Sequence, residues 1–355
     1  MESGLTISYR GKDFLNTIGR NWAIIFLALE VLFFSLAARR FFSFAIFQII
    51  LLYGVPLFLL AVAQTMVIIT GGIDLSIGFV LGLASVVCSK TIVVLAGAGI
   101  PPGAAIAVGV VFTLVSCSIP GVINGLMISR FKVPPLIATF AMFGIAHGVA
   151  ELILGGVWVK NMPHLANKIG NSYLLYFVPD HNQISFLVKP VVERGTEIVS
   201  VIPNVTIAAF MVILIFNFKL NHTRFGRYTY AIGGSATSAI RAGVDNGLHL
   251  IKVYSASAFL AAVGGVLYSL MFVTGKGDAG TAFLLDAIVA VVIGGASLMG
   301  GKGTIRGSIT GCFILIVLEN GLRMLGVSTF DKYIAVGIIL VIAVLIDKVT
   351  VQEEA

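Results

Sequence analysis

Hydrophobic runs of roughly 20 residues recur along almost the whole chain, and they limit its possible folds more than any other feature. Runs of this length match the thickness of a lipid bilayer when they form α-helices. The composition agrees, because 58% of the residues are hydrophobic, 11% are charged and the mean hydropathy is +1.04. Since the runs are continuous rather than alternating, they are not the strands of a membrane barrel. The sequence predicts an all-α polytopic membrane protein.

Ten of these runs are predicted to be transmembrane helices, with one domain covering 1–355. The predicted spans are 22–37, 46–69, 73–96, 103–128, 135–155, 201–217, 251–273, 282–298, 305–322 and 332–346. We expect two larger segments outside the membrane, an outer segment at 156–200 and an inner loop at 218–250. The first run is interpreted as an uncleaved helix, and a signal peptide that ends near residue 37 is the alternative.

The Lys and Arg residues indicate the direction of the spans. The net charge of +7 is scattered over short loops and forms no basic face, so we exclude nucleic acid as a partner. With the N-terminus inside, 13 Lys and Arg fall in inner segments and five in short outer segments. Although Arg39 and Arg40 oppose this orientation, the bias predicts that both termini are cytoplasmic.

The stretch IITGGIDLSIGFVLG, residues 68–82, interrupts an apolar run with two glycines, an aspartate and a serine. Glycine lets the backbone leave the helix, and Asp74 or Ser76 can then cap the next helix. One interpretation is a tight cytoplasmic turn. The other is a broken helix that presents polar groups to a translocation route, because irregular backbone at membrane depth must be buried in protein or line a cavity.

Three further polar residues are expected to belong to the same route. Gln64 and Thr70 lie on the preceding helix, and Asn124 lies in the stretch IPGVINGLM. Their neutral hydrogen-bonding groups suit an uncharged polyhydroxylated solute better than an ion. The predicted substrate pathway is therefore formed by Gln64, Thr70, Asp74, Ser76 and Asn124.

Other ionisable residues inside the predicted spans are candidates for function, because charges are expensive at membrane depth. They are Glu30, Lys90, Glu151, Asp286 and Glu319. The four-residue spacing of Glu319 and Arg323 predicts a structural ion pair on one helix face. His147 and Glu151 have the same spacing without a second histidine, so we expect an interhelical hydrogen bond rather than a metal site.

A second glycine-rich stretch, LDAIVAVVIGGASLMGGKGT at 285–304, has some likeness to a phosphate-binding loop. That motif requires glycine where Ala296 stands and Ser or Thr where Gly303 stands. We therefore reject nucleotide binding, and any ATP with its Mg²⁺ must be bound by another chain. No cofactor is expected in this chain.

The inner loop contains a predicted short helix over 236–242. Ser235 is placed to cap its start and Gly243 to end it. Because Ala236, Ala239 and Ala242 are small, the helix is suited to dock into a groove on a cytoplasmic partner, with charges supplied by Arg224, Arg227 and Arg241. An ordinary solvated loop is the alternative.

Five motif blocks now identify a resemblance over roughly residues 45–347. The blocks are GGIDLSIG (71–78), GVINGL (121–126), VPPLIATF (133–140), RFGRYTYAIGG (224–234) and LDAIVAVVIGGASLMGGKG (285–303). In these blocks the chain resembles the permeases of ribose/galactose/xylose-type carbohydrate ABC importers. It departs from their pattern at Ser235, Leu284 and Ala296.

The resemblance implies the permease fold of ABC importers and a place in the bacterial cytoplasmic membrane, surrounded by lipid. It implies two permease subunits (identical or paralogous), cytoplasmic ATPases, and a periplasmic or lipid-anchored solute-binding protein. The substrate is expected to be a monosaccharide, with a nucleoside or a sugar-like signal as the alternative. The implied coupling element to the ATPase comprises Gly233, Gly234, Ser235, Ala236, Ala239, Arg241 and Gly243.

Two other classes are weighed against this interpretation. An ion-coupled secondary carrier would use membrane-embedded acids such as Asp74 or Glu151 as coupling sites. A membrane-embedded enzyme would need a nucleophile with a base or a metal cluster, and none of the five histidines has a cysteine or second histidine at ligand spacing. We therefore do not expect an enzyme.

Overall fold

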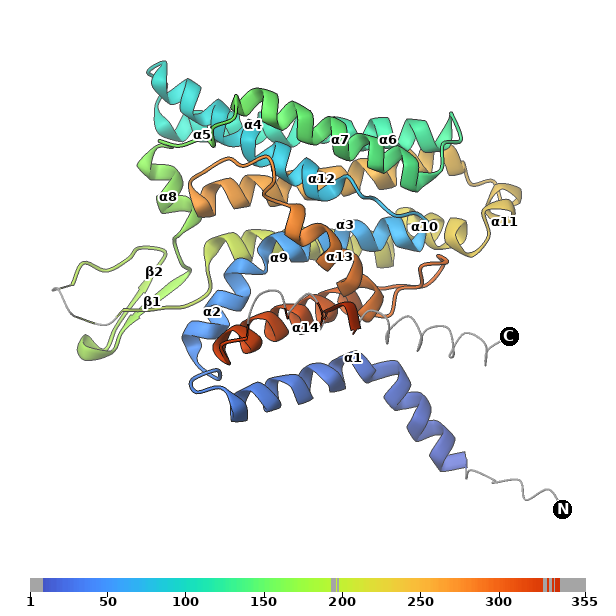
Figure 1. Cartoon of the computed structure of the whole chain (residues 1–355), viewed down its shortest axis with the longest axis horizontal. Helices are drawn as coiled ribbons and strands as arrows, with labels where there is room; N and C mark the ends of the chain where they lie inside the picture. Colours follow the sequence, from blue (N-terminus) through green and yellow to red (C-terminus); the bar gives the residue numbers. More distant parts are fainter. Residues whose placement is uncertain are drawn as a thin grey trace.

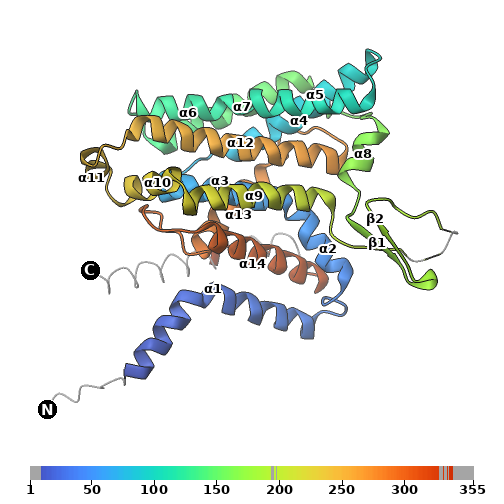
Figure 2. The same cartoon turned by 180° about the vertical axis from the view of Figure 1, so that it is seen from behind.

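The computed structural model describes residues 9–192, 196, 198–327, 331, 334 and 336–338, with side chains from residue 22 onward. Its long helices lie side by side, with helix α11 at one end of the bundle and strands β1 and β2 at the other (Figures 1 and 2). We call these the inner end and the outer end, after the orientation predicted from Lys and Arg.

The elements follow one another along the chain in two groups. The first group is α1 (Tyr9–Ala37), α2 (Phe44–Tyr53), α3 (Val55–Ile69), α4 (Ile77–Gly97), α5 (Pro102–Ser116), α6 (Ile119–Ser129) and α7 (Pro135–Leu154). The second group is α8 (His164–Gly170), β1 (Leu175–Val178), η1 (Pro179–His181), β2 (Gln183–Phe186), β3 (Val199–Ser200), α9 (Asn204–His222), α10 (Arg224–Gly234), α11 (Ala236–Arg241), α12 (Asn246–Phe272), α13 (Thr281–Ile293) and α14 (Ile305–Met324).

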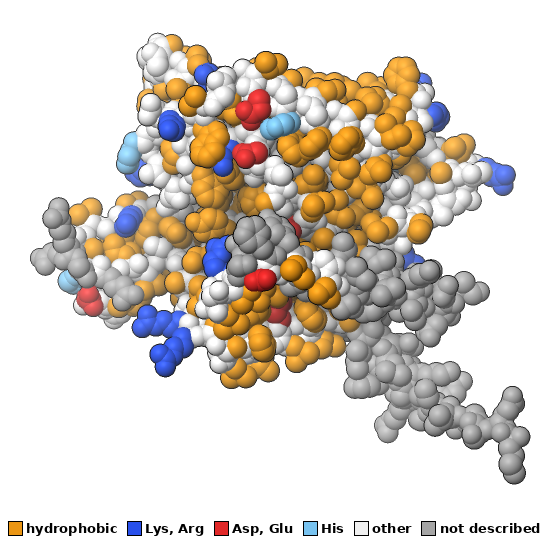
Figure 3. Space-filling view, viewed as in Figure 1, with side chains coloured by type: hydrophobic (Ala, Val, Ile, Leu, Met, Phe, Trp, Pro, Cys, Tyr) orange, Lys and Arg blue, Asp and Glu red, His pale blue; other side chains and the backbone are white. Residues whose placement is uncertain are grey.

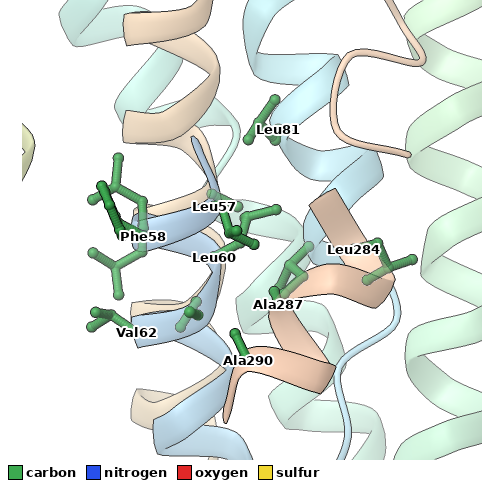
Figure 4. Close-up of a cluster of buried hydrophobic side chains, with 14 of the residues drawn as sticks. Leu57, Phe58, Leu60, Val62, Leu81, Leu284, Ala287 and Ala290 are labelled. Carbon is green, nitrogen blue, oxygen red and sulfur yellow. The ribbon is translucent and has the colours of Figure 1, made fainter. Parts of the chain in front are cut away.

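Helix α3 is the centre of the bundle. Every one of its 15 side chains is buried, as its sequence VPLFLLAVAQTMVII requires, because a helix that is apolar on all sides must be surrounded. Figure 4 shows Leu57 and Leu60 of α3 packed near Leu81 of α4 and Ala287 of α13. The hydrophobic core therefore joins the two halves of the chain.

The predicted span 46–69 is not one straight helix. It is divided into α2 and α3, which meet at an angle of 47°. The division falls at Gly54, two residues before Pro56. Proline has no N–H to donate and its ring crowds the preceding turn, so the helix bends there.

Among the described residues, six helical segments are long and apolar enough to cross a membrane, with α5 and α6 counted as one, or seven if α2 and α3 form one bent span. The chain is therefore a multi-pass membrane protein. Two further predicted spans are represented by shorter apolar helices, Trp22–Ala37 and α13. The predicted span 332–346 lies almost wholly outside the described residues. The count of ten and the cytoplasmic termini remain predictions.

Two predicted spans are shorter than expected. The span predicted at 282–298 ends as α13 at Ile293, because Gly294 and Gly295 follow and Gly295 has a φ of +87°. The span predicted to begin at residue 73 begins as α4 at Ile77. In each case hydropathy alone predicts a longer helix, but polar or glycine residues interrupt the helix before the predicted end.

The expectation of an all-α chain needs one correction in the outer segment 156–200. Strands β2, β1 and β3 form a small antiparallel sheet, in which Tyr176 pairs with Ser185 and Ser200. Strand β1 alternates half-buried and buried side chains, as expected of a strand with one covered face. Asn182, with a φ of +46°, closes the turn to β2.

Candidate functional site

Two short non-helical segments lie inside the bundle. The inner break, residues 70–76, connects α3 to α4, and the outer break, residues 273–280, connects α12 to α13. Both touch the first turns of α4. A Cβ on Gly78 would lie 2.7 Å from the Gly280 carbonyl oxygen, and a Cβ on Gly82 would collide with the Gly277 carbonyl. Irregular backbone at membrane depth must be enclosed by protein or line a cavity. The two breaks are therefore the candidate positions for a substrate-binding site.

The inner break is organised around the carboxylate of Asp74. Its Oδ1 accepts hydrogen bonds from the Ser76 N–H (2.9 Å) and the Ser76 hydroxyl (2.5 Å). Its Oδ2 accepts one from the Ser257 hydroxyl on α12 (2.9 Å). The Asp74 side chain is therefore held by both the segment that carries it and a helix 183 residues away.

Gln64 and Asn124 complete this network. In the amide orientation that satisfies both groups, Gln64 donates to the Asp74 carbonyl (3.2 Å) and accepts from the Asp74 N–H (3.3 Å). Asn124 Nδ2 donates to the Ser76 hydroxyl (3.0 Å). The Thr139 hydroxyl of α7 donates to the Ile73 carbonyl (3.1 Å). Side chains from α3, α6, α7 and α12 thus fix one loop.

The structure therefore brings together four of the five residues predicted for the substrate pathway. Gln64, Asp74, Ser76 and Asn124 are at most 2% exposed. Thr70 lies apart, with its hydroxyl donating to the Val67 carbonyl of its own helix (2.7 Å). In this conformation the network is sealed inside the bundle.

The capping prediction for this segment was wrong in its detail. Ser76 occupies the N-cap position of α4, but within the described residues its side chain caps no helical N–H. Its hydroxyl is used by Asp74, whose Oδ1 also accepts the Ser76 N–H two residues along the chain. The geometry is that of an Asx turn, because a short carboxylate binds the backbone two residues on more readily than the helix beyond it.

Two residues beside Asp74, Ser257 and Tyr254, were not predicted from the sequence. Ser257 is one of several small residues in an apolar span, and nothing local distinguishes it. Tyr254, one turn earlier on α12, presents its hydroxyl to Gly72, where a Cβ would collide with it. Among the described residues, neither the Tyr254 hydroxyl nor the Asn124 Oδ1 has a hydrogen-bond partner.

At its beginning, the inner break contacts two other segments through glycines. We call these residues the glycine junction (Gly71, Gly233, Gly300 and Gly301). The Gly301 N–H donates to the Ile69 carbonyl at the end of α3 (2.9 Å). A Cβ on Gly233 of α10 would collide with that same carbonyl, and a Cβ on Gly300 would lie 3.0 Å from Gly71 N. The junction therefore joins α10, the inner break and the loop after α13.

Helix α11 forms as predicted beside this junction. The Ser235 side chain accepts the Ser238 N–H (3.2 Å), and Gly243, with a φ of +83°, follows the end of the helix. Ala239 is buried against Ile232 and Val244, so it packs into its own chain rather than facing a partner.

The outward face of α11 instead presents Ile240, which is 61% exposed, next to the exposed Arg241. The pattern of small residues at Ala236, Ala239 and Ala242 did not predict this exposed isoleucine. Gly233, which was also predicted for the coupling element, belongs to the glycine junction. At the neighbouring Gly234, a Cβ atom would meet no atom of the described residues within 4 Å.

The outer break differs from the inner one because its charged side chains are accessible. The Lys276 and Asp278 side chains are 25% and 58% exposed, and their charged atoms lie 3.8 Å apart. Lys276 Nζ lies 3.9 Å from the centre of the Trp158 ring. A Cβ on Gly277 would collide with Glu151 Oε1, so the exposed Glu151 carboxylate lies directly against this segment.

The hydrogen bond expected for His147 and Glu151 is not formed with any residue that the structure describes. His147 instead packs its ring edge-to-face on Phe79, with centroids 5.1 Å apart, and its Nδ1 is buried without a partner in the described chain. The predicted Glu319–Arg323 ion pair is confirmed at 2.8 Å.

Three further ionisable residues of the predicted spans, Asp286, Glu319 and Glu30, belong to neither break. Asp286 and Glu319 line a pocket of about 140 Å³ between α13 and α14, together with Asn320 and Arg323. Glu30 is 8% exposed on α1, and neither of its carboxylate oxygens has a partner within the described residues.

Comparison with known proteins gives a family match over most of the chain. The family model described as "branched-chain amino acid transport system / permease component" matches residues 46–344. A ribose import permease protein of Bacillus subtilis (strain 168) is 34% identical over 291 residues, which are 82% of this chain and 80% of that protein.

Two further relatives extend the comparison. A fructose import permease protein of Rhizobium meliloti is 31% identical over 345 residues, or 97% of this chain and 89% of that protein. An autoinducer 2 import system permease protein of Yersinia pseudotuberculosis is 28% identical over 316 residues, or 88% of this chain and 81% of that protein. No solved structure matches the chain.

Proposed function

Because this chain belongs to the branched-chain amino acid transport system / permease component family, we propose that it is the membrane subunit of an ABC importer for a monosaccharide. The observation that supports this most directly is the similarity to ribose and fructose import permeases over four-fifths or more of both chains. The family is one of transporter permeases rather than enzymes. Family membership also disfavours an ion-coupled secondary carrier.

The substrate is a small polyhydroxylated molecule, with a ribose- or fructose-like sugar as the first choice. The relative that imports autoinducer 2 supports one alternative, a sugar-like signal. Serine, asparagine and glutamine side chains at the inner break offer both donors and acceptors, as hydroxyl groups require.

The subunit works in an assembly. A permease of this kind requires a cytoplasmic ATPase, which binds ATP and Mg²⁺, and a solute-binding protein at the outer end. A second permease subunit completes the route, and the assembly lies in the cytoplasmic membrane of a bacterium. The small sheet and α8 of the outer segment 156–200 lie at the end where the solute-binding protein would dock (Figure 1).

Helix α11 transmits the action of the ATPase. Ile240 is the exposed apolar residue that an ATPase groove would cover, with Arg241 supplying charge beside it. Movement of α11 and α10 would reach the glycine junction through Gly233, which packs on the Ile69 carbonyl. The junction is continuous with the inner break, so the ATPase and the translocation route are mechanically connected.

The inner break is the inner gate of the route. The hydrogen bonds of Asp74, with Gln64, Ser76 and Asn124, hold it closed in the present conformation. Thr70 lies at the entrance to this segment, half-buried. When the gate opens, these polar groups exchange their internal hydrogen bonds for those of the solute.

Uptake by a strain that lacks the gene tests the function. The strain is complemented with the wild-type chain, with a variant carrying Ile240→Asp on α11, or with the wild-type chain beside an ATPase that cannot hydrolyse ATP. We expect labelled ribose or fructose to enter only with the wild-type chain and an active ATPase.

Three outcomes of this experiment would contradict the proposal. Uptake that persists without ATP hydrolysis and collapses with an ion gradient would identify a secondary carrier. Uptake of autoinducer 2 but of neither sugar would move the substrate to the signal class. Normal uptake by the Ile240→Asp variant would refute the role of α11.

A further inference from the structure

We propose that Glu151, His147, Lys276 and Asp278, with Trp158 beside them, form a hydroxyl-binding site for the solute on the outer half of its route. We call this group the outer station. The proposal rests on the proposed function, because it assumes that a sugar crosses the subunit. In this proposal the sugar forms its first polar contacts inside the membrane at the outer break, which no sequence motif identifies.

The depth of these residues is the first argument. Glu151 and His147 lie three and seven residues before the outer end of α7 at Leu154. Gly277 reaches inward to Gly82, which is only five residues from the start of α4. A charged side chain that faces lipid inside the membrane is energetically costly. Several charges gathered here therefore indicate a water-lined surface rather than a lipid-facing one.

Accessibility is the second argument. Lys276 and Asp278 keep 25% and 58% of their side-chain surface open, and Glu151 is exposed. Figure 3 shows acidic, basic and histidine side chains gathered near the outer end of α7, on a face that is otherwise mostly apolar. Polar groups that are exposed at membrane depth are accessible to a solute, whereas the Asp74 carboxylate is buried and already accepts hydrogen bonds from Ser76 and Ser257.

The chemistry of the group fits a sugar better than an ion. Two carboxylates accept hydrogen bonds and the Lys276 ammonium donates them. The buried His147 Nδ1 beside them has no hydrogen-bond partner among the described residues. Trp158 is 52% exposed and offers a flat apolar surface. Sugars present hydroxyl groups around their edge and C–H groups on their faces. A dedicated ion site would instead concentrate charge of one sign.

An aromatic row connects the outer station to the inner break. Along α7, His147 is followed inward by Phe143 and Phe140, whose rings stack with centroids 5.4 Å apart. Phe79 of α4 contacts both His147 and Phe143, at 5.1 Å and 3.9 Å between centroids. The next residue inward, Thr139, donates to the Ile73 carbonyl of the inner break. One face of α7 therefore runs from the station to the inner gate.

Cysteine labelling in the assembled importer tests the station directly. The three native cysteines are at most 1% exposed, so they should react little with a charged, membrane-impermeant thiol reagent. We expect Asp278→Cys to react from the outer side, and the reaction to slow several-fold when sugar-loaded binding protein and ATP are present. Lys90→Cys, an exposed position on α4 outside the station, serves as the matched control whose reaction sugar should not change.

Transport kinetics give a second readout. Glu151→Gln and Asp278→Asn each keep an oxygen acceptor but lose the negative charge. Uptake at sub-saturating sugar should therefore fall about tenfold, as expected when a hydrogen bond to a charged group becomes a neutral one. ATPase activity stimulated by the binding protein should change less than twofold, since the coupling helix is untouched. Lys90→Gln should leave both activities unchanged.

The outcomes separate this inference from the proposed function. If the wild-type assembly imports no sugar, the proposed function and the station both fail. If it imports sugar while Asp278→Cys is unreactive or is not protected, or if both variants import at the wild-type rate, the station alone is refuted.

Discussion

The inner and outer breaks are alike in length and position against α4, yet their polar groups are used in opposite ways. At the inner break the Asp74 carboxylate accepts three hydrogen bonds and is 1% exposed. At the outer break Asp278 forms one long ion pair and has a side chain that is 58% exposed. An acidic residue at membrane depth therefore does not define a site by itself. Whether such a residue stabilises the fold or can bind a solute depends on the hydrogen bonds and ion pairs that it already forms.

The contrast also separates two ways of keeping backbone irregular inside a membrane. The inner break satisfies its groups with side chains from four helices and so behaves as part of the core. The outer break is supported by close glycine contacts and by hydrogen bonds between Ser85 of α4 and the Lys276 backbone, and it leaves Asp278 exposed and Lys276 partly exposed. We expect substitutions at the first to change stability and transport together, and substitutions at the second to change transport alone.

The largest effect is expected where both breaks rest on the same helix. In Gly82→Leu the new side chain would collide with the Gly277 carbonyl, and overpacking of this kind costs about 1–3 kcal/mol or more. Uptake should be lost and the melting temperature of the purified subunit should fall. Gly97→Leu on the same helix is the control, because a Cβ there meets nothing within 4 Å in the described part of the chain.

An effect of comparable size is expected at Asp74. Asp74→Ala strands the Ser76 N–H, the Ser76 hydroxyl and the Ser257 hydroxyl, and each unsatisfied buried group costs about 1–3 kcal/mol. Uptake and thermal stability should both fall, while the protein still inserts. Asp74→Asn, which keeps one oxygen, should lie between wild type and Asp74→Ala. Full transport by Asp74→Ala would show that the network is no more than a turn.

A smaller and more selective effect is expected at the glycine junction. In Gly233→Ala the added methyl group would collide with the Ile69 carbonyl, so α10 must shift away from α3. We expect ATP hydrolysis to continue while uptake falls, which the ratio of sugar imported to ATP hydrolysed will measure. The neighbouring Gly234→Ala fills open space and should leave this ratio unchanged. Equal ratios in the two variants would mean that the junction transmits no movement.

The smallest effect on stability is expected at the outer break. The Lys276–Asp278 pair is partly exposed, and exposed pairs contribute at most about 1 kcal/mol. Asp278→Asn should therefore leave the melting temperature of the purified subunit nearly unchanged. A drop as large as that of Asp74→Ala would erase the distinction between the two breaks.

Much of the helical framework was predictable from residue order alone. Hydropathy located α7, α9, α12 and α14 to within a few residues at most ends, because a membrane span must be apolar along its whole length. The Ser235 cap and the left-handed Gly243 marked α11. These features depend on neighbours in sequence.

The features that sequence analysis missed depend on neighbours in space. Ser257 is one serine among many until α12 packs beside the inner break. The outer break has no motif, because its shape is set by glycine contacts with α4 across the bundle. Ala239 was expected to face a partner and is buried in its own chain, since a three-residue alanine pattern does not say which side of a short helix is outward.

The short length of α13 has an electrical consequence. Its 13 residues span about 20 Å, whereas the hydrocarbon layer is about 30 Å thick. The outer break, which precedes α13 in the chain, carries the accessible charges of Lys276 and Asp278. Moving one charge through 100 mV involves about 2.3 kcal/mol, while an uncharged solute gains and loses nothing. The membrane voltage therefore does no work on a neutral solute, whose accumulation must be coupled to ATP hydrolysis or to an ion that moves with it.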